Sequence, residues 1–182
     1  SEGGLISDAG TLHVALSAST FYFQLVPLTS LTIDTSTTGT FDRFYRDGTG
    51  GFNVQLAQTT VDNTQYDDGD GTLGLIGVVK FAVEWFYLVL DDSSNGELYS
   101  IYGQASYNSL SEAEASSPPS DTPGILTNLG ILVGKVISQN GATEIIEAQS
   151  AFSTVYSSSL AEYHNNLAGL NVGDYQHLTT AE

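Results

Sequence analysis

Short runs in which apolar residues alternate with polar or small ones, separated by glycine-containing turns, constrain this chain most. Leu12, Val14 and Leu16 alternate in this way, and the same period of two recurs at Phe21 and Phe23. A period of two places one face of a strand on a core and the other face in solvent. Asp-Gly, Gly-Gly and Asn-Gly pairs supply the backbone freedom that tight hairpin turns need. The pattern therefore predicts many short antiparallel strands.

Two stretches carry the strongest hairpin signals. In FDRFYRDGTGGFNVQL, residues 41–56, Asp-Gly and Gly-Gly separate two aromatic-rich runs. In DNTQYDDGDGTLGLIGVV, residues 62–79, a longer loop precedes a strand that we expect to be more buried. The run 72–91 is apolar on both faces, so its periodicity fits either one long strand or two. The stretches 41–56 and 62–79 each predict a pair of strands that lie side by side in a sheet.

The residue pattern of the sequence changes after residue 107. Ser109 and Glu112 have the spacing of a capping box, which predicts a short helix over 109–116. The sequence PPSDTPG, residues 118–124, then interrupts both helix and strand, because proline lacks the amide hydrogen that either ladder needs.

A second β segment follows this interruption. ILVGKVISQ, residues 131–139, is typical of a buried strand, and Asn140-Gly141 predicts a hairpin turn after it. We therefore expect a mostly β fold, in which 5–104 and 131–146 share one antiparallel β-sandwich-like core with the short helix on its surface. This β-rich domain would span residues 1–150, and residues 151–182 would form a C-terminal oligomerisation or linker segment.

The charge balance excludes several function classes. Four basic residues face 21 acidic ones among 182, which gives a formal net charge of −17. Such a surface repels nucleic acid and anionic membranes. The longest apolar run, residues 75–90, contains Lys80 and Glu84 and is too short to span a bilayer. We expect neither nucleic-acid binding nor membrane insertion.

Catalytic motifs are missing from the sequence. The chain has no cysteine, and its three histidines are His13, His164 and His177. It contains no G-x-S-x-G elbow, no phosphate-binding glycine loop and no H-E-x-x-H helix. We therefore expect no enzymatic activity and no cofactor.

The acidic loop YDDGDGT, residues 66–72, has two interpretations. Asp67, Asp68 and Asp70 could bind calcium, because hard cations prefer clustered oxygen ligands in flexible loops. The loop departs from the EF-hand pattern, since Tyr66 occupies the first ligand position. Aspartate and glycine are also the residues that a surface hairpin turn requires.

Aromatic side chains are dense, which raises the possibility of a carbohydrate-binding module. Aromatic faces stack on the apolar faces of sugars, yet tyrosine and tryptophan are also favoured strand residues that line sandwich cores. The candidates are Tyr22, Tyr45, Tyr66, Trp85, Tyr87, Tyr99, Tyr102 and Tyr107.

The C-terminal part carries an apolar stripe at spacings of 4, 4, 3, 4 and 3, which resembles a short heptad pattern. Serines, asparagines and Gly169 weaken a lone helix here, so the stripe is best explained as a seam that partner chains cover. His164 and His177 flank a turn and would order it by hydrogen bonding, because two such ligands without cysteine make a poor zinc site. The seam residues are Phe152, Tyr156, Leu160, Tyr163, Leu167 and Leu170.

Several segments resemble virion proteins of tailed bacteriophages, in particular tail fibres and structural fibre proteins. FYRDGTGGF and DNTQYDDG are similar to the upstream hairpins of that group. The resemblance extends over residues 1–182 and is most specific in the last twenty. It is carried by YGQASYNSLSEAEASSPPSDTPG, ILVGKVISQNGATEI, AFS and HNNLAGLNVGDYQHLTTAE.

The resemblance implies a homotrimeric fibre component that is assembled in the host cytoplasm and exposed on the virion. It implies no catalytic residues, and it implies contacts with other virion proteins and with a glycan or protein on the host surface. Proteins of the group usually continue beyond such a stretch, so we expect further fibre modules to follow. A head fibre or decoration protein, a carbohydrate-binding module and a bacterial surface adhesin are the alternatives.

Overall fold

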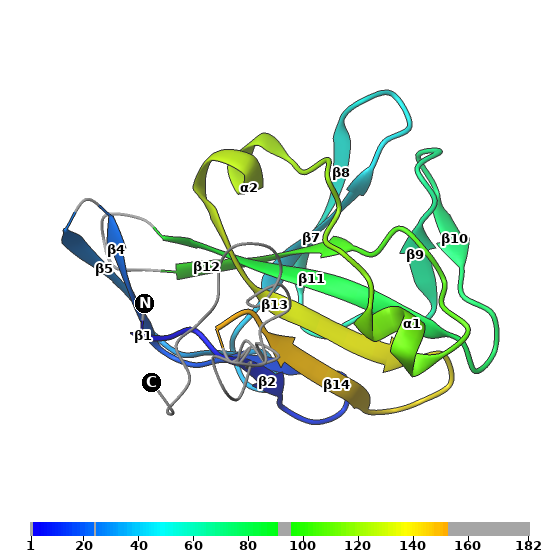
Figure 1. Cartoon of the computed structure of the whole chain (residues 1–182), viewed down its shortest axis with the longest axis horizontal. Coiled ribbons are helices and arrows are strands. Elements are labelled where there is room, and N and C mark those ends of the chain that lie inside the picture. Colours follow the sequence, from blue (N-terminus) through cyan, green and yellow to red (C-terminus); the bar gives the residue numbers. More distant parts are fainter. Residues whose placement is uncertain (1, 24, 91–95, 153–182) are drawn as a thin grey trace, which may run out of the picture.

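A six-stranded sheet forms the centre of the fold (Figure 1). The computed structural model describes residues 2–23, 25–90 and 96–152. In spatial order the sheet contains β14 (Ile145–Ser150), β13 (Gly130–Gln139), β11 (Phe81–Leu90), β12 (Gly96–Tyr102), β7 (Phe41–Arg46) and β8 (Phe52–Gln58).

Strand β11 lies in the middle of this sheet, between β12 and β13. Its sequence FAVEWFYLVL is apolar at almost every position, and the eight residues from 82 to 89 are all buried. A strand that reads as a continuous apolar run is expected where both faces of a sheet are covered. Two hydrophobic cores therefore form, one on each face.

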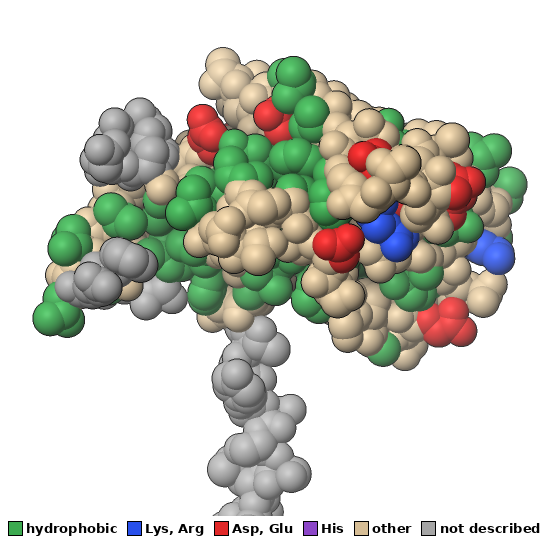
Figure 2. All heavy atoms as spheres, turned by 90° about the horizontal axis from the view of Figure 1, so that it is seen from above, with side chains coloured by type: hydrophobic (Ala, Val, Ile, Leu, Met, Phe, Trp, Pro, Cys, Tyr) green, Lys and Arg blue, Asp and Glu red, His purple; other side chains and the backbone are tan. Residues whose placement is uncertain are grey.

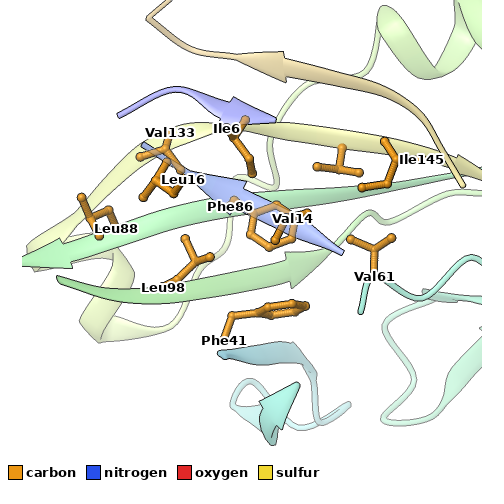
Figure 3. Packing of buried hydrophobic residues seen from close by; sticks show 11 residues of the cluster. Ile6, Val14, Leu16, Phe41, Val61, Phe86, Leu88, Leu98, Val133 and Ile145 are labelled. Atoms are coloured by element: carbon orange, nitrogen blue, oxygen red, sulfur yellow. The ribbon is translucent and has the colours of Figure 1, made fainter. Parts of the chain in front are cut away.

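The first face is covered by a small three-stranded sheet. This sheet consists of β2 (Ile6–Asp8), β3 (Val14–Leu16) and β6 (Ile33–Asp34). Figure 3 shows the inward side chains of β2 and β3, among them Val14 and Leu16, beside Phe86 and Val133 of the large sheet. The two layers form the β-sandwich-like part of the molecule.

The second face is covered by the connection between β12 and β13. This connection contains two short helices, α1 (Leu110–Glu114) and α2 (Gly124–Leu129), which bury Ala113 and Leu126 against the sheet. The sheet contributes Trp85 and Ile137 to this core, together with neighbouring aromatic side chains.

Two hairpins project from opposite ends of the body (Figure 1). At one end, β4 (Ser19–Phe23) pairs with β5 (Val26–Ser30), and β1 (Glu2–Gly3) pairs with the other side of β4. At the other end, β9 (Gln65–Asp67) pairs with β10 (Leu73–Leu75).

The predicted fold class is confirmed, since the protein is mostly β with antiparallel sheets and two short helices. The hairpin predicted over 41–56 is β7–β8, and the Asn140-Gly141 turn joins β13 to β14. The predicted N-cap forms, since the Ser109 hydroxyl accepts a hydrogen bond from the Glu112 amide, but the Glu112 carboxylate accepts from the amide of Asn108, one residue before the N-cap, instead of from Ser109.

Three details differ from the sequence predictions. Strand β12 runs parallel to β7, the exception among the described strand pairs. The run 72–91 forms two strands, one of the two alternatives left open, but the first of them, β10, is more exposed than expected, with Leu75 at 79% exposure. Helix α2 begins directly after Pro123, where we expected an interruption; proline just ahead of the first turn is compatible with a helix because its missing amide hydrogen is not needed there.

Within the described part of the chain, the structure contains no helix whose length and hydropathy would let it cross a membrane.

Candidate functional site

Arg43 and Glu84 form an ion pair in the interior of the protein. The Arg43 Nε donates to the Glu84 Oε1 over 2.7 Å, and the two side chains are only 4% and 3% exposed. The same Glu84 oxygen accepts a hydrogen bond of 2.5 Å from the Ser100 hydroxyl, and Oε2 accepts one of 3.3 Å from the Asp62 amide. The carboxylate therefore has partners on both oxygens and is closed to solvent.

The rest of the guanidinium is also engaged. It donates to the Thr60 carbonyl and to the Gln55 side chain, and it stacks 5.1 Å above the Tyr102 ring. Burial alone would lower the pKa of Arg43, but the nearby Glu84 carboxylate and other acidic groups raise it overall. The cluster thus joins β7, β11, β12 and the loop after β8, and it offers no open position for a substrate.

Lys135 serves a similar structural purpose beneath α1. Its ammonium donates to the carbonyl oxygens of Ala113, Glu114 and Ser116 at 3.0, 2.5 and 3.2 Å. Carbonyl groups at the end of a helix lack partners within the helix, so the lysine satisfies them and fixes α1 to the sheet. The ammonium also lies 5.0 Å from the Trp85 ring centroid, and burial lowers the pKa of Lys135.

The acidic loop is a turn braced by its own aspartates. The Asp67 side chain is fully buried, and its Oδ2 accepts hydrogen bonds from the Arg46 amide and from the Arg46 Nε at 3.0 Å. Asp68 accepts from the Asp70 amide, and Asp70 accepts from the amide and hydroxyl of Thr72.

These aspartates therefore do not converge on one point. Among the residues that the structure describes, no three histidine, aspartate or glutamate side chains gather so as to hold a metal ion. The hydrogen bonds show the turn that the sequence predicted at Asp67, Asp68 and Asp70, and the calcium interpretation stays a prediction.

Three of the four basic side chains thus have partners within the fold. Arg43 and Arg46 pair with the buried Glu84 and Asp67, and the buried Lys135 donates to backbone carbonyl oxygens. The exterior is therefore even more one-sided in charge than the composition indicates. A one-signed exterior keeps copies apart and opposes contact with other acidic surfaces.

The aromatic candidates mostly face the core. Trp85, Tyr87, Tyr99 and Tyr102 are buried, and Tyr99 stacks on Phe44 with ring centroids 5.9 Å apart. Tyr45, Tyr66 and Tyr107 are half-buried, whereas Tyr22 is 62% exposed. The rings do not form an open platform for a sugar.

The described histidine is a structural residue. His13 donates from Nδ1 to the Thr59 carbonyl oxygen over 2.8 Å and so ties β3 to the loop after β8. His164 and His177 lie outside the described residues.

A groove with apolar walls lies between the β4–β5 hairpin and α2. Its volume is about 680 Å³. Tyr22 and Leu129 on its two sides are 62% and 60% exposed, and Phe152 is 38% exposed. Figure 2 shows this end of the molecule at the left, with hydrophobic side chains along the hairpin and the adjoining surface. The groove is lined by Phe21, Tyr22, Leu28, Leu90, Asn128, Leu129, Gly130, Ile131 and Phe152.

Phe152 is the first residue of the predicted seam and the last residue that the structure describes. Its ring contacts Phe21, with centroids 5.5 Å apart and planes inclined by 57°. The other seam residues, Tyr156, Leu160, Tyr163, Leu167 and Leu170, lie outside the described residues. The described body thus places an exposed apolar groove at the point where the stripe begins.

The sequence predicted Phe152 as a seam residue, which stays a prediction, and named Tyr22 only as a sugar-binding candidate; it did not predict the groove that these two residues line. Its walls come from β4, β5, the end of β11, α2, the start of β13 and Phe152, so no short window of sequence contains it. The exposure of apolar residues in the hairpin, among them Leu25 at 92%, marks this surface, and only the structure reveals it. Comparison of the chain with family models, curated proteins and solved structures finds no match.

Proposed function

We propose that this protein is a structural component of a bacteriophage virion. It acts as a domain of a tail fibre in the host-attachment apparatus, as an adaptor, a shaft or a receptor-binding part. The observation that carries the proposal is the apolar groove at Phe152, where the body meets the stripe of residues 152–170. An apolar surface of this kind, next to an apolar stripe, is typical of a protein that functions in an assembly.

The interior supports a structural role. The buried charged side chains make structural hydrogen bonds. Glu84 and Arg43 join neighbouring strands, and Lys135 caps α1. Among the described residues, no nucleophile stands beside a base in an open cleft. We therefore propose that the protein is not an enzyme and that its contribution lies in its shape and contacts.

The stripe supports assembly into a homotrimer. Serines, asparagines and glycine make residues 153–170 a weak helix former, so an isolated segment gains little from its own backbone. Association with identical segments would bury the leucines and tyrosines and link folding to assembly. A closed cyclic assembly also matches the fibre resemblance of HNNLAGLNVGDYQHLTTAE.

The absence of cysteine fits a protein whose persistence depends on assembly instead of disulfides. Partners of the trimer would be other virion proteins and a glycan or protein of the host surface. The proposed location is the virion, after assembly in the host cytoplasm.

Light scattering tests the oligomeric state. Residues 1–182 should show three times the mass of one chain, and residues 1–151 should be monomeric under the same conditions. A monomeric mass for residues 1–182 over a wide range of concentrations would contradict the proposal.

Labelling of intact particles tests the location. An antibody raised against residues 1–150 should mark the tail when it is viewed by electron microscopy. Labelling confined to the head would favour the alternative of a head fibre or decoration protein.

A further inference from the structure

The apolar groove has walls that are built by separate elements yet lie on a fixed frame. Leu129 is at the end of α2, and α2 is held on the sheet by the buried Leu126. Leu90 and Ile131 come from the neighbouring strands β11 and β13, which pair over most of their length. The hairpin supplies Phe21 and Leu28. The groove is therefore preformed, as binding sites for apolar groups usually are.

The residues that follow Phe152 fit this groove by composition. Residues 153–170 carry a single charged side chain, Glu162, in a chain whose formal net charge is −17. A segment with so little charge can approach the body without the repulsion that a second acidic body would meet. Tyr156 and Leu160 supply the apolar side chains that such a groove accepts.

The position of Phe152 limits how far from the groove the next residues of the chain can lie. Its ring is already a wall of the groove, and Tyr156 follows four residues later. An extended chain covers at most about 3.3–3.6 Å per residue, so the Tyr156 backbone lies within roughly 14 Å of Phe152. A link this short gives an effective concentration on the order of millimolar, which favours contact within one chain over contact between chains.

We propose that the groove is the docking site for Tyr156 and Leu160 of the same chain. The docked residues anchor the start of the C-terminal segment on the body and leave Tyr163, Leu167 and Leu170 for the seam between copies. Only the assignment of the last three residues to a seam between copies rests on the proposed function. Docking fixes the direction in which the segment leaves the body, and hence the angle between the body and the fibre axis.

Because the chain has no cysteine, an introduced pair reports proximity cleanly. A disulfide forms only when the two Cβ atoms approach to about 3.8 Å. Leu129→Cys combined with Tyr156→Cys in residues 1–182 should form an intrachain disulfide under mild oxidation. Non-reducing electrophoresis and peptide mass mapping detect it.

The matched control combines Leu5→Cys with Tyr156→Cys. Leu5 is an aliphatic residue at 43% exposure that does not line the groove. It follows Gly4, where an added Cβ would lie 3.5 Å from the Phe152 ring, so the same short link lets residue 156 reach it. The groove pair should form its disulfide at least about tenfold faster than the control pair, because both pairs share the link and only the groove pair gains from docking. Equal rates would overturn the inference.

A second measurement avoids introduced bonds. Chymotrypsin cleaves after tyrosine and leucine, so docking should protect Tyr156 and Leu160 from it. Leu129→Ser should accelerate cleavage at these two residues about tenfold, whereas Val78→Ser should leave the rate unchanged. Both substituted side chains are exposed, so we expect the body to remain folded, and the melting temperature of each variant checks this.

Exchange between copies is tested by mixing the two single-cysteine variants, Leu129→Cys and Tyr156→Cys. An interchain disulfide that forms as fast as the intrachain one would overturn docking within the chain.

The results also separate the inference from the proposed function. An intrachain disulfide in a monomeric protein supports docking and contradicts the trimer. A trimer in which the groove pair reacts no faster than the control contradicts docking and leaves the trimer standing.

Discussion

Replacing Glu84 with glutamine removes one charge from the buried ion pair and keeps nearly the same side-chain volume. The Arg43 guanidinium then remains buried without its main counter-charge, and the new amide group would point a donor at either Ser100 or the Asp62 amide. Breaking a buried pair by removing one partner costs about 3–5 kcal/mol.

The structure places the expected loss near the lower end of that range. With its amide oxygen in the place of Oε1, glutamine still accepts both hydrogen bonds made there, from Arg43 and Ser100, and the Asp62 carboxylate remains in the cluster through its 2.7 Å bond from Tyr102. We expect a loss of about 3 kcal/mol in the free energy of unfolding, which corresponds to a melting temperature lower by roughly 6–12 °C for a domain of this size.

Urea unfolding followed by tryptophan fluorescence measures this loss, since Trp85 is the single tryptophan and is buried. Arg43→Met and the double variant complete a cycle that isolates the pairwise term. Removing both charges should cost clearly less than the sum of the single changes. Lys80→Met is the control and should change the unfolding free energy by less than about 0.5 kcal/mol, as most surface substitutions do.

A loss below about 1 kcal/mol for Glu84→Gln, or a double variant whose cost is strictly additive, would refute the reasoning. An additive double variant would mean that Arg43 and Glu84 are not coupled in the folded protein, and a small single loss would mean that the buried Arg43 does not depend on the charge of Glu84.

Three further predictions concern the surface and the turns. Backbone hydrogen bonds from Thr49 and Gly51 hold the pKa of Asp47 below its ordinary 3.8. The folded state therefore binds fewer protons than the unfolded state, and stability falls as the pH drops below about 3.8. Asp47→Asn should make the melting temperature between pH 5 and pH 3 less dependent on pH. Raising sodium chloride from about 0.01 to 0.5 M should raise the melting temperature, because it screens the acidic exterior; a fall would contradict the charge argument. Gly48→Ala should lower the free energy of unfolding in urea more than Gly50→Ala does. Both glycines have positive φ, but only a Cβ at Gly48 would meet a backbone atom, the Asp70 oxygen at 2.5 Å. Equal costs of about 1 kcal/mol would show that the hairpin tips adjust freely.

The local parts of the fold were predictable from the sequence because their signals are local. Val14 and Leu16 alternate with polar neighbours and point into the core, and Asn140-Gly141 forms the predicted turn, with Gly141 at φ +92°. The N-cap at Ser109 is likewise contained within four residues. The prediction that starts a strand at Leu12 was too early by two residues, because Thr11 and Leu12 adopt positive φ and the strand begins at Val14.

The arrangement of strands was not predictable in the same way. The parallel pairing of β7 with β12 brings together segments that are separated by two hairpin signals, and no residue in either strand marks its partner. Helix α2 was missed because GILTNL has only modest helix propensity and follows a proline-rich stretch. Its packing through Leu126 decides the conformation.

The candidate site was predictable only at its edge. The stripe identified Phe152, but the groove beside it depends on α2 and on the β4–β5 hairpin, so it requires the three-dimensional fold. The charge count likewise identified four basic residues without indicating that Arg43 and Lys135 are buried.

The order of strands in the large sheet has a consequence for synthesis on the ribosome. The first eighty residues supply β2, β3 and β7, yet the strands that cover their apolar faces, β11, β12 and β13, are translated later. At roughly 5–20 residues per second, the leading part of the nascent chain waits roughly 4–16 s from the start of synthesis before β11 begins to be made. During that interval its strand residues are uncovered and open to pairing with other nascent chains. The excess of aspartate over basic residues then protects the chain before it folds, because emerging polypeptides of the same sign repel one another.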